Sequence, residues 1–264
     1  MKKYSIFIIQ FVVLVLMVPT IVAQSNQNTR FIFESGAIIR GDTTIKDLAL
    51  VFTGDEFGDG ADFISAVLSE KKIKASFFLT GNFYRNPDFK NVLKKLKKNG
   101  NYLGSHSDKH LLYCDWENRD SLLVTRKEFT DDLLNSYIAM KPFGINKEDA
   151  LYYMPPYEWY NDTIAAWTAG LGLHLINFSP GTRSNADYTY PEMGKRYIGS
   201  DDIYSYIIKY EKEKYSGLNG FILLVHIGTD ARRTDKFYHK LPALISELKS
   251  KGYRFVRIDK LLEK

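Results

Sequence analysis

The chain has 264 residues, of which 45% are hydrophobic and 25% are charged, and its formal net charge is +5. This composition is typical of a globular protein with a buried core, and it excludes a disordered chain, a collagen-like fibre and a small disulfide-rich scaffold. The positive charge is too small for a nucleic-acid-binding protein, which carries a concentrated basic surface.

The N-terminal segment is the first distinctive feature in chain order. Lys2 and Lys3 precede an apolar run over residues 6–18, and the small residue Ala23 precedes the polar Gln24. This order is typical of a secretory signal peptide, so we predict a signal at residues 1–23 and an exported protein, periplasmic or extracellular. The alternative is a retained membrane anchor. The run is shorter than the roughly 20 apolar residues of a spanning helix, so we expect no stable membrane span after cleavage.

Short apolar runs alternate with amphipathic stretches through the rest of the chain. Residues 24–46 form a leader, in which we expect a short hairpin around Gly36. The predicted strands are residues 48–52, 75–80, 102–104, 151–154, 173–178, 220–226 and 254–258. The predicted helices are residues 62–72, 87–98, 127–140, 162–169, 201–215 and 241–251.

This alternation indicates an α/β fold, with a parallel sheet covered by helices. Seven β/α units favour a closed or nearly closed barrel over an open doubly wound sheet. No linker interrupts residues 47–264, so we expect a single domain there, and a monomer. Cys114 is the only cysteine, so the chain has no internal disulfide.

Polar residues of the kind that perform chemistry follow several of these strands. In parallel α/β proteins the active residues lie at the carboxyl ends of the strands. Asp55, Glu56 and Asp59 follow the first strand, His106 and His110 follow the third, and His226 ends the sixth. The carboxyl end of the sheet is therefore the predicted site.

His106 and His110 are four residues apart, which places both imidazoles on one face if the segment turns helically. Two imidazoles and a carboxylate form a tripod that leaves positions open on a divalent metal. The alternative is a pair of exposed polar residues on a loop. We expect a metal, and this ligand set suits Zn²⁺, while Co²⁺, Ni²⁺ and Fe²⁺ also fit.

Three short motifs carry a resemblance to a known family. They are Gly-Ser-His-Ser-Asp-Lys-His at residues 104–110, Pro-Pro-Tyr at residues 155–157 and Leu-Val-His at residues 224–226. With these motifs, residues 48–262 resemble the polysaccharide deacetylases of the NodB homology domain, carbohydrate esterase family 4. The resemblance implies a distorted (β/α)7 barrel and metal-assisted hydrolysis of acetyl groups.

The sequence departs from the family pattern at three positions. The family has two adjacent aspartates after the first strand, a base and a metal ligand, where this chain has Thr53 and Gly54. The family also has an arginine before Pro-Pro, where this chain has Met154. An arginine there would be a buried unpaired charge without the first aspartate, so the two losses fit each other.

The resemblance and the nearby residues together suggest roles at this altered site. We expect Asp55, His106 and His110 on the metal, and Glu56 as the base, with Asp59 and Asp55 as rivals. His226 is expected to be the general acid, with Asp187 tuning it. The expected substrate-binding residues are Tyr157, through a backbone N–H on the oxyanion, Trp159 and Arg183.

The resulting functional prediction is an exported, metal-dependent hydrolase that removes O- or N-linked acetyl groups from a carbohydrate polymer or oligomer. The altered first motif supports a different reading, a catalytically inactive protein of the same fold that binds carbohydrate. A hydrolase of small C–N substrates is a third possibility, which export disfavours. The sequence does not distinguish an O-acetyl from an N-acetyl substrate.

Overall fold

The computed structural model describes residues 30–263. The predicted signal peptide at residues 1–23 and the start of the predicted leader lie outside this range. Among the residues described, no helix is long and apolar enough to cross a membrane.

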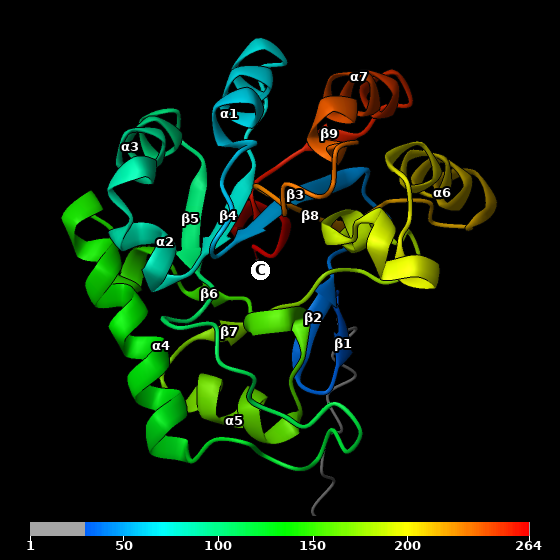
Figure 1. Ribbon diagram of the computed structural model, residues 1–264. Helices are drawn as coiled ribbons and strands as arrows, with labels where there is room; N and C mark the ends of the chain where they lie inside the picture. The colour runs from blue at the N-terminus through cyan, green and yellow to red at the C-terminus, as the bar shows by residue number, and fades with distance from the viewer. Residues whose placement is uncertain (1–29, 264) are drawn as a thin grey trace, which may run out of the picture.

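The strands form one curled sheet that the helices surround (Figure 1). The strands are β1 (Ile32–Glu34), β2 (Ala37–Arg40), β3 (Asp47–Gly54), β4 (Ser76–Leu79), β5 (Tyr102–Ser105), β6 (Tyr152–Tyr153), β7 (His174–Leu175), β8 (Phe221–His226) and β9 (Arg254–Phe255). Their order in the sheet is β1-β2-β8-β3-β4-β5-β6-β7, with β9 paired to β3. The predicted α/β barrel of a single domain is confirmed.

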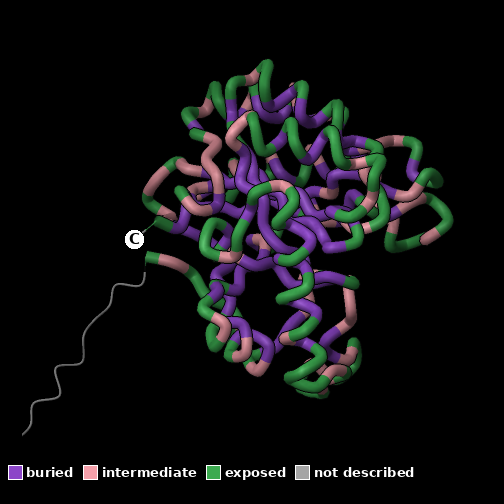
Figure 2. Tube along the Cα trace, turned by 90° about the vertical axis from the view of Figure 1, so that its left-hand side faces the viewer, coloured by how far each residue is buried: buried purple, intermediate pink, exposed green. Residues whose placement is uncertain are grey.

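The helices cover the outer face of the sheet (Figure 1), and buried residues are concentrated in the interior of the molecule (Figure 2). They are α1 (Ala61–Glu70), α2 (Gly81–Arg85), α3 (Lys90–Lys98), α4 (Arg126–Met140), α5 (Asp162–Gly170), α6 (Ser200–Glu213), α7 (Leu241–Ser250) and α8 (Ile258–Leu261). Short 3-10 turns lie between them, among them Pro156–Glu158 and Ser184–Tyr188. The centre of the sheet is apolar throughout, and the rings of Phe52 and Phe77 stack there at 4.9 Å between centroids.

The N-terminal hairpin belongs to the barrel. β1 and β2 form the hairpin expected around Gly36, where Ser35 and Gly36 both have positive φ. β2 pairs with β8 on one side. On its other side Ile38 forms a bridge with Ile176, just beyond β7. The hairpin therefore spans the gap between β8 and the end of β7.

The register of the parallel strands brings their carboxyl ends to one level. Gly54 at the end of β3 pairs with Leu79 of β4, and Leu79 pairs with Ser105 of β5. Thr53 pairs with His226 of β8. The residues that follow these strands therefore lie at a common edge, where parallel α/β proteins have their sites.

Several predicted strands are shorter than the pattern suggested, most of all those at residues 173–178 and 254–258. β9 ends at Phe255, and Ile258 begins α8, since its backbone N–H is bound by the Ser76 hydroxyl at 2.8 Å instead of by a neighbouring strand. β7 ends at Leu175, because Ile176 turns to meet β2. The short helix α2 was not predicted, and the Thr80 side chain caps it by accepting from the Phe83 N–H.

The packing around Gly54 generates a prediction about stability. A Cβ at this position would lie 2.4 Å from Ile227 Cγ2 and 3.0 Å from Leu79 Cδ2. We expect Gly54→Ala to destabilise the fold by about 1–3 kcal/mol through overpacking. Chemical denaturation measures the effect. In the control Gly170→Ala, the nearest atom to the new Cβ is 3.7 Å away, and a stability loss equal to that of Gly54→Ala would contradict the packing argument.

Candidate active site

His106 directly follows β5 and is held by a backbone carbonyl. Its side chain is buried, and its ring Nδ1 lies 2.9 Å from the Met154 carbonyl oxygen. A carbonyl only accepts, so Nδ1 carries the proton and Nε2 presents a lone pair to the site. Met154 is itself fully buried, so the position where the family has an arginine is apolar here and serves the site through its main chain.

A tight turn, and not the helix expected from the spacing, brings His110 to His106. Ser107 and His110 both have positive φ, of 72° and 56°. The His110 N–H donates to the Ser107 hydroxyl at 3.0 Å, and the Lys109 N–H donates to buried Asp132 of α4 at 2.9 Å. As a result the Nε2 atoms of His106 and His110 lie 3.3 Å apart.

Burial keeps both imidazoles neutral. It lowers the pKa of His106 well below its ordinary value, and the neighbouring His110 adds to this effect. Burial also lowers the pKa of His110, although Asp55 opposes the change. Neutral imidazole is the form that binds a metal, because a protonated nitrogen has no lone pair to give.

The two histidines fit a divalent metal by chemistry and by spacing. Nitrogens bound to one tetrahedral zinc at about 2.0–2.1 Å lie roughly 3.3 Å from each other. Within residues 30–263, however, no three His, Cys, Asp or Glu side chains form a ready-made metal-binding group. A carboxylate ligand would therefore have to swing in. Asp55, whose charge acts on His110, and Glu158, 3.8 Å from His106, are near enough.

The predicted acidic residues after β3 have different surroundings. Asp55 accepts a hydrogen bond from the Thr80 hydroxyl at 2.7 Å. Glu56 is exposed at the rim of the pocket. Asp59 points away, since it accepts from the Thr229 N–H at 2.8 Å and the Tyr238 hydroxyl at 2.9 Å and pairs with Lys236.

His226 and Asp187 form a close pair on the opposite side of the pocket. Asp187, from the turn Ser184–Tyr188, is buried, and its Oδ1 lies 2.6 Å from His226 Nδ1. Its Oδ2 accepts from the His226 backbone N–H at 2.9 Å. Burial lowers the pKa of His226, but the charge and hydrogen bond of Asp187 and the charge of Glu158 together raise it, so the net pKa lies above the ordinary value. His226 is therefore disposed to carry a proton into the pocket.

Glu158 is a site residue that the sequence reasoning missed. It follows Tyr157 in the turn after β6, and both residues have positive φ, of 53° and 59°, which costs of the order of 1–3 kcal/mol each outside glycine. The Glu158 side chain is only 12% exposed. Burial raises its pKa to about 7, with His226 opposing and Asp187 adding to the increase. Its place directly after the Pro-Pro-Tyr motif was the available signal.

These side chains line a pocket of about 800 Å³ at the carboxyl ends of the strands. Aromatic rings form part of its wall: Trp116, Tyr157, Tyr188 and Tyr190. The lining does not include Trp159, whose indole N–H donates to the Asp115 carbonyl, or the exposed Arg183. The structure thus gathers Asp55, Glu56, His106, His110, Tyr157 and His226, with Asp187 behind His226.

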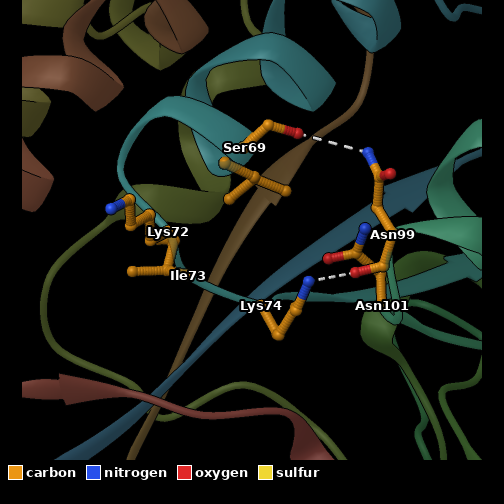
Figure 3. Close-up of a pocket in the computed structure, with 7 residues that line it drawn as sticks. Ser69, Lys72, Ile73, Lys74, Asn99 and Asn101 are labelled. Carbon is orange, nitrogen blue, oxygen red and sulfur yellow. Dashed lines mark hydrogen bonds between the residues drawn. The ribbon is translucent and has the colours of Figure 1, made fainter.

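A second cavity, of about 320 Å³, lies where the chain enters β4 and β5 (Figure 3). Lys74 and Asn101 precede these strands, and the Lys74 ammonium donates to the Asn99 carbonyl across the cavity. No histidine or carboxylate lines it. This second cavity lies at the amino ends of the strands, and its lining residues offer no comparable chemistry.

Sequence comparisons identify relatives. The chain is 26% identical over 212 residues to a peptidoglycan-N-acetylglucosamine deacetylase of Bacillus cereus, covering 78% of this chain and 85% of the relative. It is 27% identical over 143 residues to a chitin deacetylase of Pestalotiopsis sp., covering 54% of this chain but only 44% of that relative's length.

Solved structures share the fold. PdaA of Bacillus subtilis, a family 4 carbohydrate esterase, superposes with a TM-score of 0.67 at 24% identity, covering 86% of this chain and 85% of PdaA. A pseudoenzyme of the same esterase family from Bacillus anthracis has a TM-score of 0.67 at 19% identity, covering 88% of this chain and 70% of its own. The polysaccharide deacetylase family model matches residues 40–176. This chain therefore belongs to the polysaccharide deacetylase family.

Proposed function

We propose that this protein is an exported, metal-dependent hydrolase that removes O- or N-linked acetyl groups from a carbohydrate polymer or oligomer. The observation that carries the proposal is a single pocket that contains two separate groups of reactive side chains. His106 and His110 present two neutral nitrogens 3.3 Å apart on one side, and the His226–Asp187 pair stands on the other. Such an arrangement suits hydrolysis with a separate acid for the leaving group.

His106 and His110 would hold the metal, with Asp55 as the proposed carboxylate ligand and Zn²⁺ as the first metal to test. A divalent metal, when bound, lowers the pKa of water and polarises an acetyl carbonyl. The protein's own contribution is to keep both imidazoles neutral and oriented. The Met154 carbonyl orients His106, and the left-handed turn at Ser107 orients His110.

His226 is the proposed donor of a proton to the departing sugar oxygen or nitrogen. Asp187 fixes the Nδ1 proton of the ring, which leaves Nε2 to face the pocket in the charged form. The backbone N–H of Tyr157 remains the proposed contact to the oxyanion, a role that suits fixed main-chain donors.

The aromatic wall supports a sugar substrate. Trp116 and Tyr157 line the pocket with 56% and 44% of their surfaces exposed, and their rings meet edge to face at 5.5 Å. Exposed rings of this kind offer flat apolar faces for the C–H side of a sugar ring. The relatives named as deacetylases of peptidoglycan N-acetylglucosamine and of chitin make polymers of N-acetylglucosamine the first substrates to test.

The second candidate is a catalytically inactive protein that binds carbohydrate in the same pocket. Its support is the absence of a carboxylate at Thr53 and Gly54, together with the likeness to a pseudoenzyme. Acetate release from acetylated glucosamine oligomers and acetylated xylan separates the two. Release by the purified protein supports the enzyme, whereas sugar binding without any release supports the inactive protein.

His106→Ala tests the metal site directly. The change removes one of two nitrogens that point to a common centre, and we expect bound metal to fall from about one equivalent to a small fraction. Metal content by elemental analysis measures this without reference to activity. His174→Ala, an exposed histidine outside the pocket, is the control. Full metal content in the His106→Ala protein would contradict the assignment.

Asp187→Asn tests the proton donor. Asp187 raises the pKa of His226, so its removal should lower that pKa and move the alkaline limb of the pH–rate profile to lower pH. We also expect kcat to fall by about 10- to 100-fold. Titration of His226 by NMR follows the pKa independently of turnover. The exposed Glu192→Gln is the control, and an unchanged His226 pKa in Asp187→Asn would count against the pair.

Trp116→Ala tests the aromatic wall. The change removes one stacking contact, which contributes about 1–2 kcal/mol to the binding of an acetylated oligomer. KM should therefore rise about 5- to 30-fold while kcat stays nearly constant. Initial-rate kinetics separate the two constants. Tyr215→Ala removes a fully exposed ring outside the pocket and should change neither. An equal KM for wild type and Trp116→Ala would exclude Trp116 from substrate binding.

A further inference from the structure

The chemistry at this pocket lacks an obvious proton acceptor. Thr53 and Gly54 supply no carboxylate at the end of β3. Gly54 cannot simply be replaced by a larger residue, because Ile227 and Leu79 already fill the space that a side chain would need. A carboxylate that serves this part of the pocket must therefore come from another strand end.

Four other carboxylates near the pocket are hydrogen-bonded to other residues or lie away from the histidines. Asp55 accepts from Thr80, and Asp187 uses both oxygens on His226. Asp59 is bound to Thr229, Tyr238 and Lys236, away from the histidines. Glu56 is exposed at the rim. None of them stands free between the two histidine groups.

Glu158 is in that place. Its Oε1 lies 3.8 Å from His106 Nε2, and it lines the same pocket as His226. Among residues 30–263 no lysine or arginine forms an ion pair with it, so it is not part of a structural salt bridge. A nearly buried carboxylate without a lysine or arginine partner is costly to keep, which indicates a use in the site.

The residues at the end of β3 leave space for the Glu158 side chain. Thr53 is buried, and its hydroxyl makes no hydrogen bond of ordinary geometry within the described chain. Thr53, Glu158 and His226 line the same pocket. The small Thr53 side chain leaves room for a carboxylate that arrives from β6, and the buried Met154 leaves no cation to pair with one on β3.

The backbone conformation at residues 157 and 158 directs the Glu158 side chain into the pocket. Tyr157 and Glu158 are consecutive non-glycine residues in the left-handed region, with φ of 59° and 53°. Glycine would adopt this conformation without strain, so a glutamate stands here against the backbone preference. Strain of this kind persists where the side chain it positions is needed.

We propose that Glu158 is the catalytic carboxylate that takes the proton from the attacking water. The inference rests on the proposed deacetylation. The water O–H bond breaks, its proton passes to Glu158, and its oxygen bonds to the acetyl carbon as the carbonyl π pair moves onto oxygen. The tetrahedral species collapses, the bond to the sugar nitrogen or oxygen breaks, and His226 protonates the leaving atom. Acetic acid and the free sugar leave, and Glu158 and His226 re-equilibrate with solvent protons.

Glu158→Gln keeps the size of the side chain and removes the proton acceptor. We expect bound metal and KM to stay within about threefold of wild type, and kcat for acetate release to fall by about 10²- to 10⁴-fold. Glu192→Gln makes the same chemical change at an exposed glutamate outside the pocket lining, and this control should keep kcat within about threefold. Loss of metal from the Glu158→Gln protein would make Glu158 a ligand and overturn the proposal, as would a larger loss of kcat in Glu56→Gln.

Glu158→Gly guards against a folding defect, because glycine suits the backbone there and leaves a space in the pocket. Added formate, a small carboxylate, should restore part of its acetate release and should leave the wild-type rate unchanged. A folded, metal-loaded Glu158→Gly protein with wild-type kcat and no response to formate would overturn the proposal. If the wild-type protein released no acetate from any acetylated sugar, the proposed function itself would fail. If the wild-type and Glu158→Gln proteins were equally active, only the role of Glu158 would fail.

Discussion

The site depends on the register of the parallel strands. Because β3, β4, β5 and β8 end at one level, residues from distant parts of the sequence meet at a single edge. His106 and His226 are 120 positions apart in the chain, yet both belong to one pocket. Hydrogen bonds between strands fix this level, so each side chain needs only a short connection to reach the centre.

Much of the architecture was readable from the sequence, for physical reasons. Buried parallel strands are nearly continuous apolar runs, and β8 (Phe221–His226) is a clear example. His106 and His110 stood out because they directly follow such a run. Their approach was predicted, although a left-handed turn and not a helix produces it. Periodicity does not report a turn of this kind, since it depends on local contacts of Ser107 and Lys109.

The carboxylates were harder to place. Closeness in sequence to the end of β3 favoured Glu56, but the structure leaves that side chain exposed. Glu158 reaches the interior only because two successive residues adopt positive φ, which no hydrophobic pattern encodes. The family arrangement, with aspartates on the first strand and an arginine after the fourth, is replaced here by a crowded Gly54 and an apolar Met154. The carboxylate near His106 comes instead from the strand end that lost its cation.

The N-terminal hairpin has a consequence for how the chain is made. Arg40 of β2 pairs with Phe221 of β8. The strand β2 is synthesised early, but it cannot form this pair until β8 has been synthesised. Contacts between such distant residues form slowly, because the intervening chain must be ordered first. The barrel cannot close while a ribosome still holds the C-terminal third. Closure of the barrel is therefore a late step of folding, which follows the synthesis of most of the chain.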